Sequence, residues 1–299
     1  MNFDLTSITE KIKVNAYLTE KALESYGQGA DADLQEIFDA QAYSLLGGGK
    51  RIRPFIVNEV CIALGGQREA SMPFAVALEM IHTYSLIHDD LPCMDDDDMR
   101  RGKPTNHKVF GYSTALLAGD ALLTKAFSVV AGNGELDHRA RAEAVKLLAD
   151  AAGECGMIGG QIIDLAGEKK RLEFGQLLRL HSLKTGALIR CAAGLGAIAA
   201  GYYPESEEFK AATEYADGIG LAFQVIDDVL DATSTADEIG KSVGGDADHN
   251  KTTFMTYFDV EGARAYAEEV TNKAISAISE WENSGTLIDL AAYLLERKY

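Results

Sequence analysis

Apolar residues recur at intervals of three and four along almost the whole chain, the spacing that forms one face of an α-helix. The pattern is clearest in residues 75–90, and its apolar positions there are Val76, Met80, Ile81, Tyr84 and Ile87. The same pattern recurs in residues 114–131, 141–152, 214–231 and 263–278. No segment alternates apolar and polar residues as a β-strand does. The chain therefore predicts an all-α protein.

Clusters of Gly, Pro, Asn and Asp interrupt the helical pattern and predict where helices end. They lie at residues 27–31, 65–67, 92–107, 132–134, 201–205 and 233–251. None of them is long or biased enough to be a linker between domains, and no repeat of fixed period occurs. Short connections favour antiparallel neighbours. We expect one domain over residues 1–299, a bundle of about ten or more mostly antiparallel helices.

Composition and charge narrow the class of protein. The chain has 299 residues, of which 47% are hydrophobic, enough for a sizeable core. The 28 Lys and Arg residues face 46 Asp and Glu residues, which gives a formal charge of −18. This balance argues against nucleic acid or an anionic membrane as the main partner. An anionic substrate would need locally clustered cations or a metal.

The cysteines and the N-terminus indicate a reduced, cytoplasmic protein. The four cysteines form no CxxC pair, and they are Cys61, Cys93, Cys155 and Cys191. We expect free thiols that act as small apolar fillers. The first residues lack the apolar core of a secretory signal, and no charge-free apolar stretch is long enough to span a bilayer.

The stretch HDDLPCMDDDDMRRGKPT, residues 88–105, concentrates negative charge. Neighbouring carboxylates repel one another, so they stay in water or are compensated by a cation. Pro92 is expected to end the helix just after Asp89 and Asp90. These carboxylates then lie at the negative end of the helix dipole, which is unfavourable without a cation.

A second apolar helix, FQVIDDVLD, ends in the same way with Asp227, Asp228 and Asp231. Solvated helix ends would explain one such case. Two helices that share an apolar run, an Asp pair and a further Asp favour a metal site. Aspartate ligands without nearby His or Cys favour Mg²⁺.

Two other metal or phosphate motifs are excluded, and a basic cluster remains. An EF-hand loop starting at Asp95 lacks its glycine and its final Glu. The stretch LLGGGKRIRP, residues 45–54, lacks the Ser or Thr and the leading strand of a phosphate loop. It still predicts a glycine hinge that brings Lys50, Arg51 and Arg53 to a helix start, a place suited to an anion. Together with Arg100 and Arg101, this cluster favours diphosphate binding.

Six motifs resemble, in order and spacing, the short-chain trans-isoprenyl diphosphate synthases, and are most similar to the bacterial farnesyl diphosphate synthases. They are GGKRIRP (48–54), IHTYSLIHDDLPCMDDDDMRRGKPT (81–105), GGQIIDL (159–165), HSLKTGALI (181–189), FQVIDDVLD (223–231) and GDADHNKTT (245–253). The resemblance covers nearly the whole chain. It implies the isoprenoid synthase fold, an all-α bundle around a deep central cavity, and a homodimer.

The resemblance also implies a reaction. Up to three Mg²⁺ ions, or Mn²⁺ in their place, would join an allylic diphosphate to the two aspartate motifs. The implied leading metal ligands are Asp89, Asp95 and Asp227, and Asp90, Asp228 and Asp231 would act directly or through water. Isopentenyl diphosphate would attack the allylic carbocation and a proton would be lost, which yields (2E,6E)-farnesyl diphosphate from dimethylallyl or geranyl diphosphate.

The resemblance assigns further roles to single residues. The leaving pyrophosphate would be neutralised by Arg100, Lys184 and Lys241. Isopentenyl diphosphate would be held by Lys50, Arg53, His82 and Arg101, with Lys251 as a further substrate-binding residue. Thr185 and Gln224 would offer oxygen dipoles to the carbocation. No protein nucleophile is required.

Each of these roles has a plainer alternative. His82 by itself would be interpreted as a core histidine. Thr185 could bond back to a carbonyl, and Gln224 could be a buried amide. Loop lysines would explain Lys241 and Lys251, and KTTFM departs from the Tyr and Pro that relatives commonly have after the Lys and Thr. The terminal residues Arg297 and Lys298 would cover the second diphosphate or form a frayed tail.

Product length depends on Tyr84 and Ser85, which precede Asp89 by five and four residues. The resemblance places this pair at the floor of the pocket, where a bulky aromatic residue shortens the product. Five helical residues rise about 7.5 Å, and helical angles place Ser85 beneath Asp89 and Tyr84 roughly 140° round the helix from Asp89. Its intrusion therefore rests on the resemblance. We expect the C15 product, and a geranylgeranyl or geranyl diphosphate synthase is the alternative.

Two other classes of protein stay open. A terpene cyclase would share the cavity and the metals but needs no isopentenyl site, so Lys50, Arg53 and Arg101 argue against it. A noncatalytic metal-binding helical protein would not explain Lys184 and Lys241 beside the acids.

Overall fold

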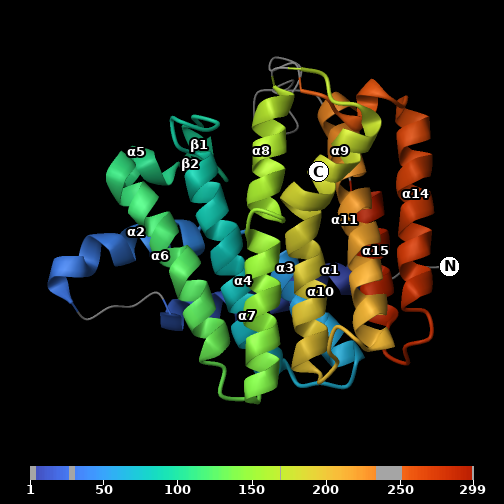
Figure 1. Ribbon diagram of the computed structural model, residues 1–299, viewed down its shortest axis with the longest axis horizontal. Coiled ribbons are helices and arrows are strands. Elements are labelled where there is room, and N and C mark those ends of the chain that lie inside the picture. Colours follow the sequence, from blue (N-terminus) through green and yellow to red (C-terminus); the bar gives the residue numbers. More distant parts are fainter. Residues whose placement is uncertain (1–4, 27–30, 169, 234–250, 298–299) are drawn as a thin grey trace.

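The computed structural model describes residues 5–26, 31–168, 170–233 and 251–297 (Figure 1). Its helices are α1 (Leu5–Tyr26), α2 (Gln35–Leu45), α3 (Ile52–Ala63), α4 (Arg68–Asp89), α5 (Asn106–Phe110), α6 (Tyr112–Ala131), α7 (His138–Ala152), α8 (Met157–Gly167), α9 (Phe174–His181), α10 (Ala187–Ala199), α11 (Glu207–Thr233), α14 (Val260–Ala277) and α15 (Gly285–Glu296). Turns of 3-10 helix cover Ala32–Leu34 and Phe254–Thr256. The all-α prediction is confirmed.

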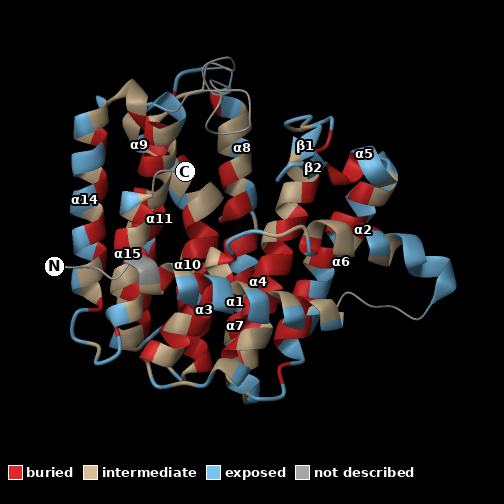
Figure 2. Ribbon diagram, turned by 180° about the vertical axis from the view of Figure 1, so that it is seen from behind, coloured by how far each residue is buried: buried red, intermediate tan, exposed pale blue. Residues whose placement is uncertain are grey.

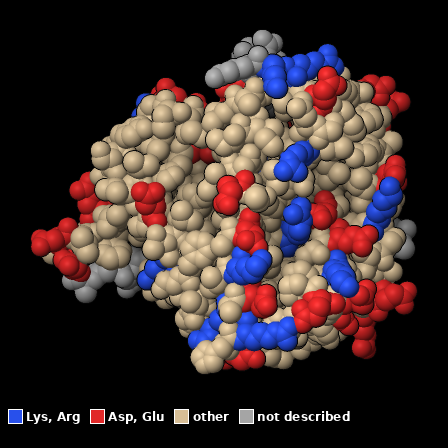
Figure 3. Space-filling view, viewed as in Figure 1, with Lys and Arg blue, Asp and Glu red and all other residues tan. Residues whose placement is uncertain are grey.

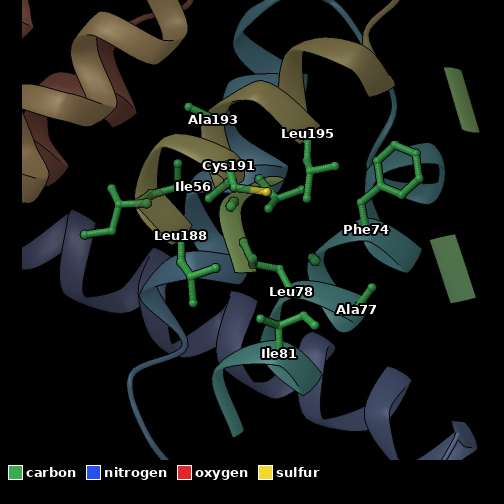
Figure 4. Close-up of a cluster of buried hydrophobic side chains, with 14 of the residues drawn as sticks. Ile56, Phe74, Ala77, Leu78, Ile81, Leu188, Cys191, Ala193 and Leu195 are labelled. Atoms are coloured by element: carbon green, nitrogen blue, oxygen red, sulfur yellow. The ribbon is translucent and has the colours of Figure 1, made fainter. Parts of the chain in front are cut away.

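Helix α10 occupies the middle of the bundle. It contacts α3, α4, α7 and α11, and all its residues except Arg190 are buried. A helix that is apolar all round is stable only inside a protein. Side chains of α3, α4 and α10 meet here, among them Ile56, Phe74, Leu78, Cys191 and Leu195 (Figure 4). Figure 2 shows the buried residues gathered on the inward faces of the helices.

The helix ends agree with the breaks predicted within the described residues. Helices α3 and α4 are separated at residues 64–67, and α4 ends at Asp89, before Pro92. The breaks at 27–31 and 233–251 lie mostly outside the described residues. Interior glycines mark close packing: a Cβ on Gly218 would lie 2.6 Å from the Cβ of Ala274, where α11 crosses α14.

One strand pair was missed by the sequence reading. Strands β1 (Met99–Arg100) and β2 (Lys103–Pro104) pair antiparallel. Two residues are too few to show an alternating pattern. Arg101 and Gly102 both have positive φ, 52° and 74°, as the tight hairpin turn requires.

A smaller apolar cluster supports the end of α11. It contains Leu177 of α9, Val225 and Val229 of α11, Phe254, and Ala263 of α14. Helix α4 instead ends on the main core, which includes Tyr84 and Ile87. The two aspartate motifs therefore stand on different hydrophobic supports.

The cysteine and membrane expectations can also be compared with the structure. All four cysteines are free, but only Cys61 and Cys191 are buried. The interpretation as apolar fillers is therefore wrong for the exposed Cys93 and Cys155. Within the described part of the chain, α6 alone is long and apolar enough to cross a membrane by length and composition. That test is also passed by core helices, and α6 packs along α4, so it is weak support for a span.

Candidate active site

Asp89 ends α4 and faces an apolar cavity. Its Oδ1 accepts a hydrogen bond of 2.5 Å from Nε2 of Gln161 on α8. Burial raises the pKa of Asp89 to about 6, although the nearby Lys184 opposes this rise. A half-buried carboxylate that burial disfavours in its ionised form is suited to gaining a cation.

Asp90 is buried and already has its cation. Its Oδ1 accepts from Nε and Nη2 of Arg100, at 2.7 and 2.6 Å. Burial still raises the pKa of Asp90, against the effect of Arg100. Arg100 thus contacts the first aspartate motif in the structure, while Asp95 lies exposed beyond it.

Asp227 lies near the end of α11 and pairs with Arg297, which also donates to the carbonyl of Phe223 at 2.9 Å. Burial raises the pKa of Asp227 to about 6, with Arg297 as the main opposing charge. Asp228 is buried and accepts a 2.6 Å hydrogen bond from the backbone N–H of Phe254. Asp231 is exposed one turn later.

In both Asp pairs, the two carboxylates therefore differ in the same way in their accessibility and in their partners. The first Asp of each pair is partly accessible and has a pKa near 6. The second Asp is buried and holds a distant part of the chain, at Arg100 or at Phe254. Sequence reasoning had grouped all of these carboxylates as direct or water-mediated ligands.

An apolar cavity of about 490 Å³ lies between α4, α6, α8 and the turn that leads into α10. Its polar lining includes Asp89, Lys184 and Thr185, and its apolar lining includes Leu123 and Ile158. The predicted floor residues Tyr84 and Ser85 both line it. The ring of Tyr84 packs edge to face on His88, 5.6 Å between centroids, and its hydroxyl is buried without a hydrogen-bond partner. Burial raises the pKa of Tyr84 to about 12.

Lys184 and Thr185 lie on a π-helical turn, Ser182–Gly186, rather than in a regular helix. Such turns often occur at functional sites. Nζ of Lys184 donates to Oδ2 of Asp164 at 2.5 Å, and a Cβ on Gly160 of α8 would overlap the Lys184 backbone. Gln161 and Asp164 were not assigned roles from the sequence. Their spacing of three within the 159–165 motif, which puts both on one face of α8, was the available signal.

A second cavity, of about 320 Å³, has apolar walls and a cluster of cations in its lining. They are Lys50, Arg51, Arg53, Arg101 and Arg297, together with His82. Arg53 and His82 line both cavities, so the two spaces adjoin. Burial and the charges of Arg53 and Arg101 lower the pKa of His82 well below 6.5, which keeps the ring neutral at physiological pH.

The anion-binding expectation for Arg51 is wrong in this structure. Its side chain is fully buried and pairs with Glu79. Lys50 is exposed, and its ammonium lies 5.6 Å from the ring centroid of Tyr293. Arg101 donates through Nη1 to the carbonyl of Gly48, which links the hairpin to the glycine loop.

The remaining predicted residues are less tightly placed. Gln224 lies three residues before Asp227 on α11 and is half-buried, as is Lys251. Lys241 and Lys298 lie outside the described residues. One group the sequence did not indicate is Asp96, Asp98 and His107, whose ligand atoms lie within 4.8 Å of one another. Lys108 pairs with Asp98 at 2.6 Å.

Comparisons with known proteins agree on one family. Residues 34–287 match the polyprenyl synthetase family. The chain is 40% identical to the farnesyl diphosphate synthase of Haemophilus influenzae over 276 residues, 92% of this chain and 94% of that protein. It is 44% identical over 268 residues to a putative geranylgeranyl pyrophosphate synthase 8 of Arabidopsis thaliana, 86% of this chain and 72% of that protein. The crystal structure of an FPP/GFPP synthase from Zymomonas mobilis superposes with a TM-score of 0.87 at 34% identity, covering 97% and 99% of the two chains.

Proposed function

We propose that this chain, which belongs to the polyprenyl synthetase family, is a prenyltransferase that makes farnesyl diphosphate. It condenses isopentenyl diphosphate with dimethylallyl or geranyl diphosphate and releases pyrophosphate. One observation carries this proposal: an apolar cavity with Asp89 and Lys184 in its lining adjoins a cavity with five Lys and Arg side chains in its lining. The first suits a hydrocarbon chain attached to a diphosphate, and the second suits another diphosphate.

A divalent metal fits the aspartate ends. The family implies a metal requirement, and Mg²⁺ is our proposal because the donors are carboxylate oxygens. Asp89, Asp95 and Asp227 would hold up to three ions, and Asp231 is exposed one turn after Asp227. The buried Asp90 and Asp228 instead keep both helix ends in place. When bound, the ions supply positive charge to the departing pyrophosphate.

Protein groups complete the allylic site. Asp164 directs Lys184, which with Arg100 would neutralise charge on the leaving pyrophosphate. Thr185 lines the apolar cavity and, with Gln224, would turn oxygen dipoles toward the allylic carbocation. The apolar walls exclude the water that would otherwise capture this cation. The pyrophosphate would accept the proton lost after condensation.

The basic cavity would bind isopentenyl diphosphate. Lys50, Arg53 and Arg101 supply positive charge, and His82 is neutral, so it binds as a hydrogen-bond donor rather than as a cation. Lys251 and Lys241 remain proposed as groups that close over the loaded site.

Product length follows from the floor of the apolar cavity. The buried ring of Tyr84 supports a C15 product. The geranylgeranyl alternative keeps some support, since relatives of both names are similar to the chain. Tyr84→Ala is expected to shift products from C15 toward C20, because it opens the floor. An unchanged C15 profile would contradict this role.

The assembly is proposed to be a homodimer in the cytoplasm, without a nucleic-acid partner. Large apolar side chains are exposed on α6, at Leu116 and Leu117, and on α8, at Ile158 and Ile162, which also line the apolar cavity. Figure 3 shows mainly uncharged side chains over this side of the molecule. A second copy would bury this surface.

The test is a product assay with purified protein and Mg²⁺. Isopentenyl diphosphate is supplied with dimethylallyl or geranyl diphosphate, and the chain length is read after removal of the diphosphate. Farnesol as the main product supports the proposal. A cyclic hydrocarbon formed without consumption of isopentenyl diphosphate would indicate a terpene cyclase, and no turnover would indicate a binding protein.

A further inference from the structure

Glu79 is the one carboxylate among the described residues that line the basic cavity. It lies on α4, three residues before His82, so both side chains occupy one face of that helix. Only 3% of its side chain is exposed. A buried carboxylate among cations that await a diphosphate opposes anion binding unless it has another task.

Glu79 is bound to Arg51. Nη1 of Arg51 lies 2.5 Å from Oε1 of Glu79, and Nη2 donates to the carbonyl of Leu45 at 2.7 Å. The Arg51 side chain has no exposed surface. Arg51 is therefore bonded to the protein, unlike the neighbouring Lys50.

These contacts close the glycine loop between α2 and α3. Leu45 is the last residue of α2, and Arg51 is the N-cap of α3. Arg51 has φ 51° and ψ 44°, a left-handed conformation that is unfavourable for a residue with a side chain. Gly48 and Gly49 before it also have positive φ. The guanidinium thus ties both ends of a strained loop together, and Glu79 anchors it to α4.

We propose that Glu79 is a positioning residue for the second substrate. Through Arg51 it fixes the loop so that Lys50 and Arg53, on either side of Arg51, face the diphosphate of isopentenyl diphosphate. This inference rests on the function proposed above for the basic cavity.

The test compares KM for the two substrates in Glu79→Gln and Glu79→Ala. We expect KM for isopentenyl diphosphate to rise about 10-fold, while KM for the allylic substrate stays within about twofold and kcat within about threefold. Glu79→Gln has nearly the same shape as the native residue but removes its charge from the ion pair with Arg51, so it remains informative if the alanine variant does not fold. Thermal unfolding monitors the fold of each variant.

A matched control is available in Glu59→Gln. Glu59 on α3 pairs with Arg68 of α4 at 2.9 Å and lines neither cavity. Both KM values should be unchanged in this variant. If Glu59→Gln raised KM for isopentenyl diphosphate as Glu79→Gln does, general loosening of α3 and α4 would explain both, and the proposal would be overturned.

A double-mutant cycle tests whether Glu79 acts through Arg51. We expect Arg51→Gln, Glu79→Gln and the double variant to raise KM for isopentenyl diphosphate by similar factors, since each removes the ion pair between Arg51 and Glu79. Multiplying effects, or an unchanged KM in Glu79→Gln, would overturn the proposal. Arg53→Ala tests the proposed function of the basic cavity separately from the role of Glu79. If this variant leaves KM for isopentenyl diphosphate unchanged, the basic cavity does not bind that substrate, and the proposed role of Glu79 is overturned as well.

Discussion

The ends of α4 and α11 present the same motif in two different settings. At α4 the buried Asp90 is held by Arg100, only ten residues along the chain. At α11 the buried Asp228 is held by the backbone of Phe254, and Asp227 pairs with Arg297 near the C-terminus. The first end is built locally, and the second is built from distant segments.

The difference shows two ways in which carboxylates at the C-terminal end of a helix are stabilised in the folded protein without a metal ion. Both ends supply a protein cation to carboxylates at the unfavourable end of a helix dipole. Both leave one half-buried Asp with a pKa near 6. A divalent ion would therefore compete with protein cations for carboxylates that are already ordered.

The sharpest test of the comparison is to remove each accessible carboxylate. Asp89→Ala should lower kcat about 10³-fold or more, and Asp227→Ala about 10- to 100-fold. The first motif supplies two proposed metal ligands, Asp89 and Asp95, and the second supplies one. Steady-state assays with saturating Mg²⁺ measure both losses, and circular dichroism checks the fold. Equal losses would show that the two ends contribute alike.

The second test uses pH and metal removal. The pKa of Asp89 and of Asp227 is raised in the folded state, so folding favours their protonated forms and stability falls as pH rises from about 4 to about 6. At pH 7 each site is expected to destabilise the metal-free protein by about 1 to 2 kcal/mol, after allowance for solvent screening. The unfolding midpoint without metal should therefore be higher at pH 5 than at pH 7.5.

Mg²⁺ should raise that midpoint at pH 7.5 and have little effect at pH 5. Asp89→Asn and Asp227→Asn should each remove part of the pH dependence. A midpoint that does not respond to either variant would contradict the assignment of these carboxylates.

The third test addresses the buried partners. Asp90→Asn weakens the pairing with Arg100 and should lower the free energy of unfolding by about 2 kcal/mol. Asp228→Asn should lower it by less than about 1 kcal/mol, because the amide oxygen can still accept from the Phe254 N–H. Urea unfolding of the two variants measures the difference. A larger loss for Asp228→Asn would reverse the comparison.

The smallest expected effect is at Arg297. Arg297→Gln removes a cation that pairs with Asp227, so Mg²⁺ should bind about threefold more tightly at pH 8, where the Asp227 carboxylate is ionised. Activity titrated with Mg²⁺ at pH 7 and pH 8 measures this, and the gain should shrink at pH 7, because the pKa of Asp227 rises further without Arg297. Arg190→Gln, whose pair with Asp217 lies outside both cavities, is the control.

Local pattern was enough to predict the helices and the two aspartate poles. Helical periodicity and Pro92 placed the end of α4 correctly, and the resemblance led to Tyr84 and Lys184 in the lining of one cavity. What could not be predicted were partners chosen by tertiary contact. Arg51 looks like Lys50 in sequence, and only its approach to Glu79 from another helix makes it structural. The two-residue strands and the link from Asp228 to Phe254 depend on the same long-range closure.

Arg53 and His82 line both cavities, and this shared lining has a consequence for repeated turnover. The product of a first condensation carries the diphosphate of isopentenyl diphosphate. Under the proposed function, this diphosphate therefore lies in the basic cavity when the product forms. To react again, that diphosphate must move to the cavity that contains Asp89, while its hydrocarbon chain already lies in the same apolar cavity. Under the proposed function, a second condensation would therefore require the ten-carbon intermediate to move between the two cavities before it reacts again.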